Sequence, residues 1–184
     1  MADVEVYARP HSFKVVEGGG ENEKVTFIPD PNFNPELVPK LHISREVAAE
    51  SKFISDLLSE FPSVMVDNVT HDDLLSAFTF LNKIVEVLGN LKEGESRMKP
   101  VNTTSTDEKT EKEKSEDAQI LGFLKERFPE SEKQKIGSVF QLLLTVNQLG
   151  STRGVNFIAK YVADMIRGKT PEQIRETFLI VPKE

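Results

Sequence analysis

The stretch that decides the fold is Phe157-Ile-Ala-Lys-Tyr-Val-Ala-Asp-Met-Ile-Arg-Gly-Lys-Thr-Pro-Glu-Gln-Ile-Arg-Glu-Thr-Phe178. Apolar residues recur in its first half at steps of three and four, which predicts a helix with one buried face. Gly168 is expected to end this helix, because glycine adopts a positive φ without a Cβ clash. Thr170 then suits the N-cap of a second helix, Pro171 suits its first position, and Gln173 can complete a capping box.

The same stretch resembles the C-terminal part of the Skp1 family, the small adaptors of cullin-based ubiquitin ligases. Members of that family carry a near-identical V-A-N-M-I-K-G-K-T-P-E-E-I-R-K-T-F run. Upstream, Gly137-Ser-Val-Phe-Gln-Leu-Leu-Leu-Thr-Val-Asn-Gln-Leu149 is similar to the family's G-T-L-F-E-L-I-L-A-A-N-Y-L. Weaker similarity covers 41–58 and 64–75, so the resemblance spans most of residues 41–178 with a charged insert inside it.

Early β-prone runs and later helical periodicities predict an α+β fold, with three early strands and six or seven helices. The resemblance implies a BTB/POZ-like domain with a small three-stranded sheet, a helical cluster and added C-terminal Skp1-type helices. We expect an N-terminal extension or an extra hairpin over 1–23 and the BTB/POZ-like domain over 24–136. The Skp1-type helices are expected over 137–184, in the same globular unit.

The segment 90–116 differs in composition from the rest of the chain. It has no aromatic residue and few aliphatic ones, and Lys and Glu alternate along it. Because such a segment buries too little apolar surface to offset the entropy of ordering, it is predicted to be a disordered loop. Its Thr and Ser residues leave a phospho-acceptor role open beside that of a solvated linker. An amphipathic helix is predicted after it, over 120–128.

Composition limits the classes of partner. The formal net charge is −7 and the pI is near 5.2, and no cluster of Lys and Arg appears, which argues against nucleic-acid binding. The N-terminus lacks the pattern of a secretory signal, and no window is apolar enough to cross a membrane. We therefore expect an acidic intracellular protein without membrane contact, and the resemblance places it in the cytoplasm and nucleus.

No catalytic, cofactor-binding or metal-binding residue is predicted. The chain has no cysteine, and its three histidines, His11, His42 and His71, fall in separate predicted elements. No H-E-x-x-H, G-x-S-x-G or phosphate-binding glycine motif occurs, and most carboxylates lie in polar contexts that give no reason for a shifted pKa. We expect the protein not to be an enzyme.

The resemblance implies two binding surfaces. The last helices of the family bind the F-box of substrate receptors, which here points to Ile166, Lys169, Pro171, Ile174 and Phe178. A different face meets the cullin, and the matching positions are Asn147 and Gln148. The helix 138–149 has more apolar residues than one face can bury, so its residues are either central core or part of a second contact surface.

Three departures from the family pattern bear on these surfaces. The family's N-Y-L-D reads Asn147-Gln-Leu-Gly150 here, so an aromatic anchor of the cullin contact is missing. Its W-D is replaced by Ile120-Leu-Gly-Phe123, and the further acidic helix that follows the family's K-T-F-N-I has no counterpart before Glu184. We expect an adaptor between a cullin and an F-box receptor. The alternative is a BTB-type scaffold outside the ligase that binds itself, as a homodimer, or another partner.

Overall fold

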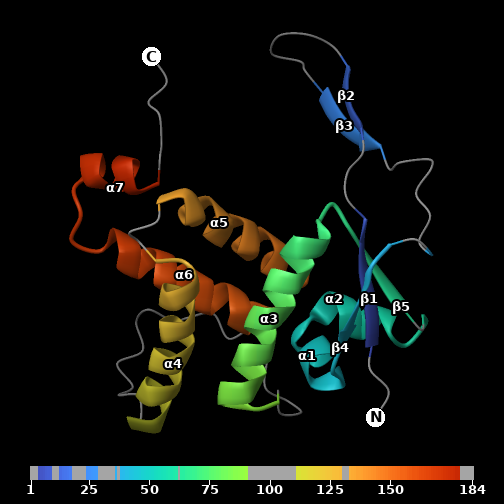
Figure 1. Cartoon of the computed structure of the whole chain (residues 1–184), viewed down its shortest axis with the longest axis horizontal. Helices are drawn as coiled ribbons and strands as arrows, with labels where there is room; N and C mark the ends of the chain where they lie inside the picture. The colour runs from blue at the N-terminus through green and yellow to red at the C-terminus, as the bar shows by residue number, and fades with distance from the viewer. Residues whose placement is uncertain are drawn as a thin grey trace.

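The computed structural model describes residues 4–9, 13–17, 24–28, 36, 38–61, 63–90, 111–129 and 133–178. These residues form a small sheet at one end of the molecule and a helical cluster at the other (Figure 1). The described helices are α1 (Arg45–Glu50), α2 (Lys52–Leu57), α3 (His71–Leu88), α4 (Glu111–Arg127), α5 (Lys133–Gln148), α6 (Thr152–Ile166) and α7 (Pro171–Thr177). This architecture confirms the predicted α+β class and is consistent with a BTB-like Skp1 fold.

The sheet has three strands, as expected, but its central strand was not expected there. β1 (Val4–Arg9) pairs antiparallel with β4 (Lys40–Ile43) and parallel with β5 (Ser63–Asp67). Alternate residues of β1 are buried in the core, where Val6 has no exposed surface. The assignment of 1–23 to an N-terminal extension is therefore wrong for β1, which is the middle of the sheet.

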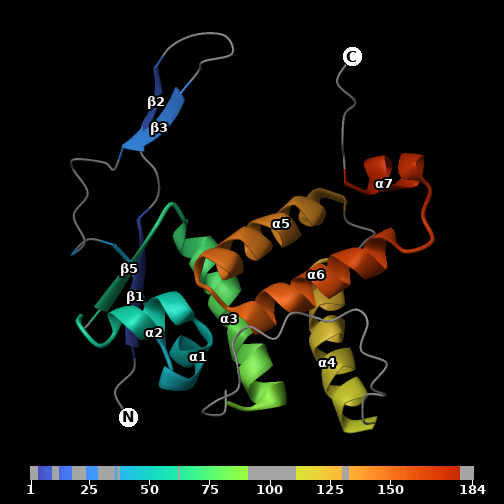
Figure 2. The ribbon, with the colours of Figure 1, turned by 180° about the vertical axis from the view of Figure 1, so that it is seen from behind.

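A separate hairpin follows β1. β2 (Phe13–Glu17) pairs antiparallel with β3 (Lys24–Ile28), with Val15 opposite Thr26. Figures 1 and 2 both show this hairpin standing apart from the three-stranded sheet. The extra hairpin was one of the two alternatives predicted for the N-terminus. The predicted domain boundary before residue 24 falls between its two strands, so it does not separate two structural units.

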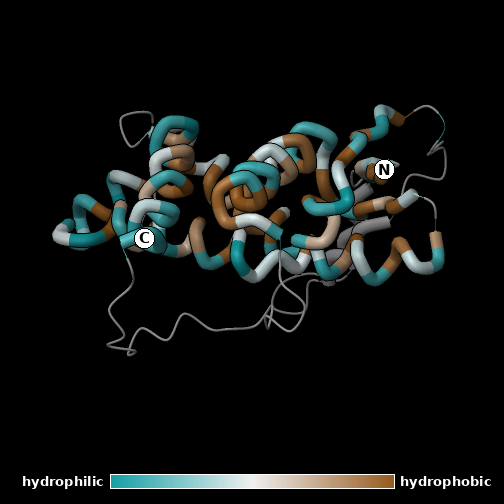
Figure 3. Tube along the Cα trace, turned by 90° about the horizontal axis from the view of Figure 1, so that it is seen from below, coloured by the Kyte–Doolittle hydropathy of each residue, from teal (hydrophilic) through white to brown (hydrophobic). Residues whose placement is uncertain are grey.

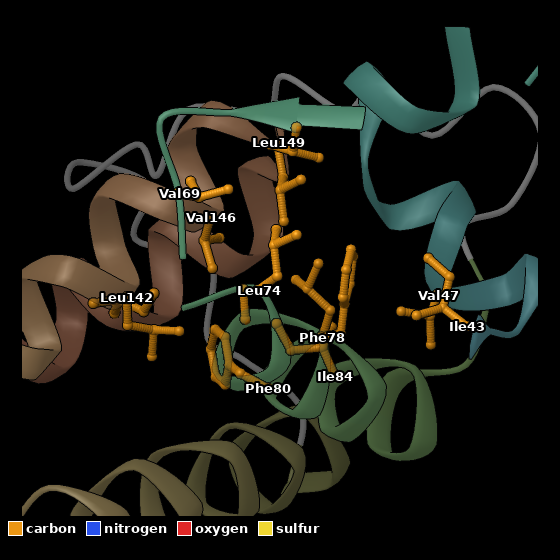
Figure 4. Packing of buried hydrophobic residues seen from close by; sticks show 14 of the residues in the cluster. Ile43, Val47, Val69, Leu74, Phe78, Phe80, Ile84, Leu142, Val146 and Leu149 are labelled. Atoms are coloured by element: carbon orange, nitrogen blue, oxygen red, sulfur yellow. The ribbon is translucent and has the colours of Figure 1, made fainter. Parts of the chain in front are cut away.

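The core lies around α3, and it joins the sheet to the later helices. Hydrophobic and hydrophilic residues alternate along the helices (Figure 3), as expected when each helix buries one face. Figure 4 shows the buried side chains of α3 between those of β4 and α1 on one side and those of α5 on the other. The labelled examples are Leu74, Phe78 and Ile84 of α3, Ile43 and Val47, and Leu142 and Val146 of α5.

The helix α4 begins earlier than its apolar pattern predicted. It starts at Glu111, so the prediction of a disordered loop over 90–116 is wrong for residues 111–116, while 91–110 lie outside the described residues. The first turns carry ion pairs at helical spacing, Lys114 with Glu111 and Lys112 with Glu116. The buried residues Ile120 and Leu124 come only later in the helix. The first turns of α4 contain charged residues and no apolar periodicity, so the sequence pattern did not indicate a helix there.

Buried polar contacts tie the C-terminal helices to the first half of the chain. Ser51 lies between α1 and α2, and its hydroxyl donates to the carbonyl oxygen of Leu149 at 2.7 Å. Next to it, the buried carboxylate of Glu50 forms a two-pronged ion pair with the guanidinium of Arg153 in α6. Arg153 also donates to the carbonyl oxygen of Gly89, just past the end of α3, at 3.1 Å. These contacts hold the ends of α1, α3 and α5 against the start of α6.

Candidate partner-binding surface

The C-terminal helical pair is built as its sequence predicts. The helix α6 ends at Ile166, and Gly168 has a φ of 76°, the left-handed conformation expected of the glycine. Thr170 caps α7 by accepting from the backbone N–H of Gln173, and the Gln173 side chain accepts from the backbone N–H of Thr170 at 2.9 Å. The predicted N-cap, capping box and first-position proline are therefore confirmed.

The helix α7 packs back onto α5. The rings of Phe178, at the end of α7, and Phe140, on α5, have centroids 5.5 Å apart and planes inclined by 59°. This tilted pairing is a favourable arrangement of two aromatic rings. It leaves Phe178 partly buried. The contact fixes α7 beside the first half of α5, as Figures 1 and 2 both show.

An exposed apolar surface remains next to this contact. Leu144 lies one turn after Phe140 on α5, and the two residues are 63% and 39% exposed. Ile166, the last residue of α6, is 37% exposed. Contiguous exposed apolar patches on a protein surface mark sites of contact with partners, and these side chains are candidates for such a patch. We call Phe140, Leu144, Ile166, Ile174 and Phe178 the α5–α7 surface.

The predicted F-box residues lie on or beside this surface, and they differ in how far they are exposed. Ile166 and Pro171 are exposed, while Lys169, Ile174 and Phe178 are partly buried. The site prediction omitted Phe140 and Leu144, although the excess of apolar residues in 138–149 was a signal for them. Leu142 and Val146, from the same helix, are core residues instead. The reading of that helix as core therefore holds for Leu142 and Val146, whereas Phe140 and Leu144 are exposed and their role as a contact surface stays a prediction.

The two predicted cullin-binding residues lie at the C-terminal end of α5, within one helical turn of Leu144. Asn147 and Gln148 are both exposed. The side-chain amide of Gln148 donates to the backbone carbonyl oxygen of Asp67, at the end of β5. Beyond them, Gly150 turns the chain with a φ of 72° toward α6. This end of α5 therefore adjoins the sheet, and it directly follows Leu144 of the α5–α7 surface.

The groups with shifted pKa values are held by structural contacts. A hydrogen bond from Lys40, with its positive charge, lowers the pKa of the Glu5 carboxyl, and Glu5 in turn raises the pKa of Lys40. Backbone and Ser44 hydrogen bonds at the start of α1 lower the pKa of Glu46. Within the described ranges, no three His, Asp, Glu or Cys side chains are placed to hold a metal ion. No helix in the described part of the chain is long and apolar enough to cross a membrane.

Comparison with known proteins bears on the helices that form this surface. Residues 155–184 match a family described as the Skp1 family, dimerisation domain. The C-terminal part of this chain is thus similar to the Skp1 family. A curated relative, SKP1-like protein 11 of Arabidopsis thaliana, is 46% identical over 43 residues, which cover 23% of this chain and 28% of the relative. The chain thus spans little more than a quarter of the length of that Skp1-like relative.

The Skp1-family match includes most of α6 and all of α7. All five residues assigned from the sequence to F-box binding lie between positions 166 and 178, inside the matched segment. The residues Phe140 and Leu144 of α5 lie outside the match, and the structure alone brings them beside it.

Proposed function

We propose that this chain is a Skp1-like adaptor that bridges a cullin scaffold and an F-box receptor in a ubiquitin ligase. The observation that carries the proposal is the α5–α7 surface, where Leu144 stays 63% exposed beside the packed pair Phe140 and Phe178. The Skp1-family match over 155–184 supports the same assignment. Work in such a ligase would place the protein in the cytoplasm and nucleus.

The F-box would bind by burying the exposed part of this surface. Burial of apolar area contributes about 25 cal/mol per Å² removed from water, so Leu144 and Phe140 are suited to be central anchors. Ile166, Pro171 and Ile174 would extend the contact along the turn between α6 and α7, and Lys169 would lie at its polar edge. Because Gly168 and the capping box already fix that turn, little ordering entropy would be lost on binding.

The cullin would bind at the C-terminal end of α5, through Asn147 and Gln148. Gln148 lies one helical turn after Leu144, so the two partners would bind to neighbouring parts of α5. The protein then acts by position: it holds a receptor and its substrate near a ubiquitin-charged enzyme and raises their effective concentration. In this mechanism the adaptor performs no chemical step itself.

A second candidate is self-association through the same apolar residues. The matched family description names a dimerisation domain, and two copies that bring Leu144 together would bury the same side chain. A homodimer of this kind would compete with the F-box for the α5–α7 surface. Addition of an F-box segment should then convert dimers to one-to-one complexes. If a dimer instead binds the F-box segment and stays a dimer, self-association and F-box binding use different surfaces.

Replacing Leu144 with Asp should weaken binding of an F-box segment by about 2 kcal/mol or more, because a charge would enter the centre of an apolar contact. Isothermal titration of the purified chain with an F-box peptide measures this change. Since Leu144 is mostly exposed, circular dichroism should show an unchanged fold.

Leu75→Asp is the matched control for this experiment. Leu75 is also an exposed leucine on a helix, 47% exposed, but it lies on α3 and outside the α5–α7 surface. Its replacement should leave F-box affinity unchanged. Equal affinity of the Leu144→Asp variant and the unmodified chain would remove the α5–α7 surface from the proposed interface.

A further inference from the structure

A cleft between α3, α4 and α5 lies apart from both surfaces described above. Its volume is about 630 Å³, and its described lining comprises Ser76, Phe123, Glu126, Arg127, Phe128 and Ser138. This volume lies within the range of ligand pockets, about 300–1,000 Å³. Ser138 lies two residues before Phe140, which turns it by roughly 200° around α5, away from the α5–α7 surface.

The guanidinium of Arg127 is held at this cleft without a carboxylate partner among the described residues. It donates to the Ser76 hydroxyl across the cleft, at 3.4 Å, and lies 6.0 Å from the centroid of the Phe128 ring. The carbonyl oxygen of Phe128 accepts from the buried hydroxyl of Tyr161, which anchors the end of α4 to α6. Arg127 is therefore positioned by its neighbours, and its contacts with the described residues use only a small part of its hydrogen-bonding capacity.

Aromatic surface lies beside this cation. Phe128 is nearly fully buried, and Phe123 is partly buried, with its ring stacked on that of the core residue Phe80 at 6.3 Å between centroids. Both rings line the cleft and are fixed by packing. A ligand that reaches Arg127 would thus contact rigid apolar groups at the same time.

We propose that this cleft binds a carboxylate attached to an apolar group, as a peptide presents it. Arginine donates two parallel hydrogen bonds to a carboxylate, and the hydroxyls of Ser76 and Ser138 supply further donors. Among the described lining residues, the charged groups are one guanidinium and one carboxylate, that of Glu126. This balance suits a singly charged group better than a phosphate dianion. The source is either the C-terminus of a chain that ends in an apolar residue or an internal acidic residue beside one.

The test uses the full chain labelled with ¹⁵N and three probes followed by backbone amide shifts. The first probe is 3-phenylpropionate, with its neutral amide as control. The second is acetyl-Gly-Gly-Phe with a free carboxylate, and the third is acetyl-Gly-Glu-Phe-Gly-amide. We expect saturable shifts around Ser76, Arg127 and Ser138 with the acid and none with the amide. The peptide that binds with the higher affinity identifies the source of the carboxylate.

Variants separate the proposed contact from nonspecific attraction. Arg127→Gln should weaken binding of the acid about tenfold or more, since hydrogen bonds to charged groups are the strong ones. Arg45→Gln removes another exposed arginine and should have no effect, while Glu126→Gln removes a repelling charge and should tighten binding. Three results would overturn the proposal. The acid and the amide bind equally well, the Arg127→Gln variant binds the acid as tightly as the unmodified chain does, or no probe gives a saturable shift.

Discussion

Replacing Arg153 with Met is expected to lower the free energy of unfolding by about 3–5 kcal/mol, the usual cost of removing one partner from a buried ion pair. The side chain of Glu50 is only 1% exposed, and Arg153 is its partner in α6. Without the guanidinium, a carboxylate would remain buried and unpaired, and the carbonyl oxygen of Gly89 would lose its donor. Chemical denaturation of the purified variant measures the loss.

Two further variants show whether burial of the charge is the cause. Glu50→Gln combined with Arg153→Met removes both charges, so the double variant should be more stable than Arg153→Met alone. Arg175→Met breaks an exposed pair with Glu172, whose atoms are 3.8 Å apart, and should change stability by less than about 0.5 kcal/mol. A similar small loss for Arg153→Met would mean that the Glu50 pair contributes little to the fold.

Replacing Gly154 with Val should destabilise the protein by about 3 kcal/mol, because no space exists for a side chain there. An added Cβ would lie 2.6 Å from Cγ1 of Val146 and 3.1 Å from Cδ2 of Leu81. Gly154 is therefore the residue that lets the start of α6 approach α5 and α3 closely. The melting temperature and the denaturation midpoint measure the effect.

A second substitution tests the cause of this loss. Val146→Ala removes the methyl group nearest to the added Cβ, so Gly154→Ala combined with Val146→Ala should lose less stability than the sum of the single changes. Gly122→Ala is the control, because a Cβ at Gly122 meets nothing within 4 Å. Full stability of the Gly154→Val variant would show that the helices separate without cost.

Local features of the fold could be predicted from the sequence. The cap of α7 and the positive φ of Gly168 depend on residues a few positions apart, and their chemistry specifies them directly. The same holds for the capping box of Thr70 and Asp73 at the start of α3. These elements needed no knowledge of tertiary contacts.

Contacts between distant segments could not be predicted in this way. β1 pairs with β4 across more than thirty residues, and no residue within either strand indicates which other strand is its partner. Glu50 and Arg153 are 103 positions apart, so neither was marked by its neighbours in the chain. The aromatic contact of Phe140 with Phe178 was missed for the same reason, and with it the place of α5 in the proposed site.

The central claim is that this chain bridges two partners, and reconstitution from purified components tests it most directly. The chain, an F-box protein and the N-terminal domain of a cullin are mixed pairwise and together, and the molar mass of each complex is measured by light scattering after gel filtration. The account predicts a one-to-one-to-one complex that forms only when the chain is present and that Leu144→Asp prevents. A chain that elutes unchanged beside both partners, or only as a dimer of itself, would contradict the adaptor function.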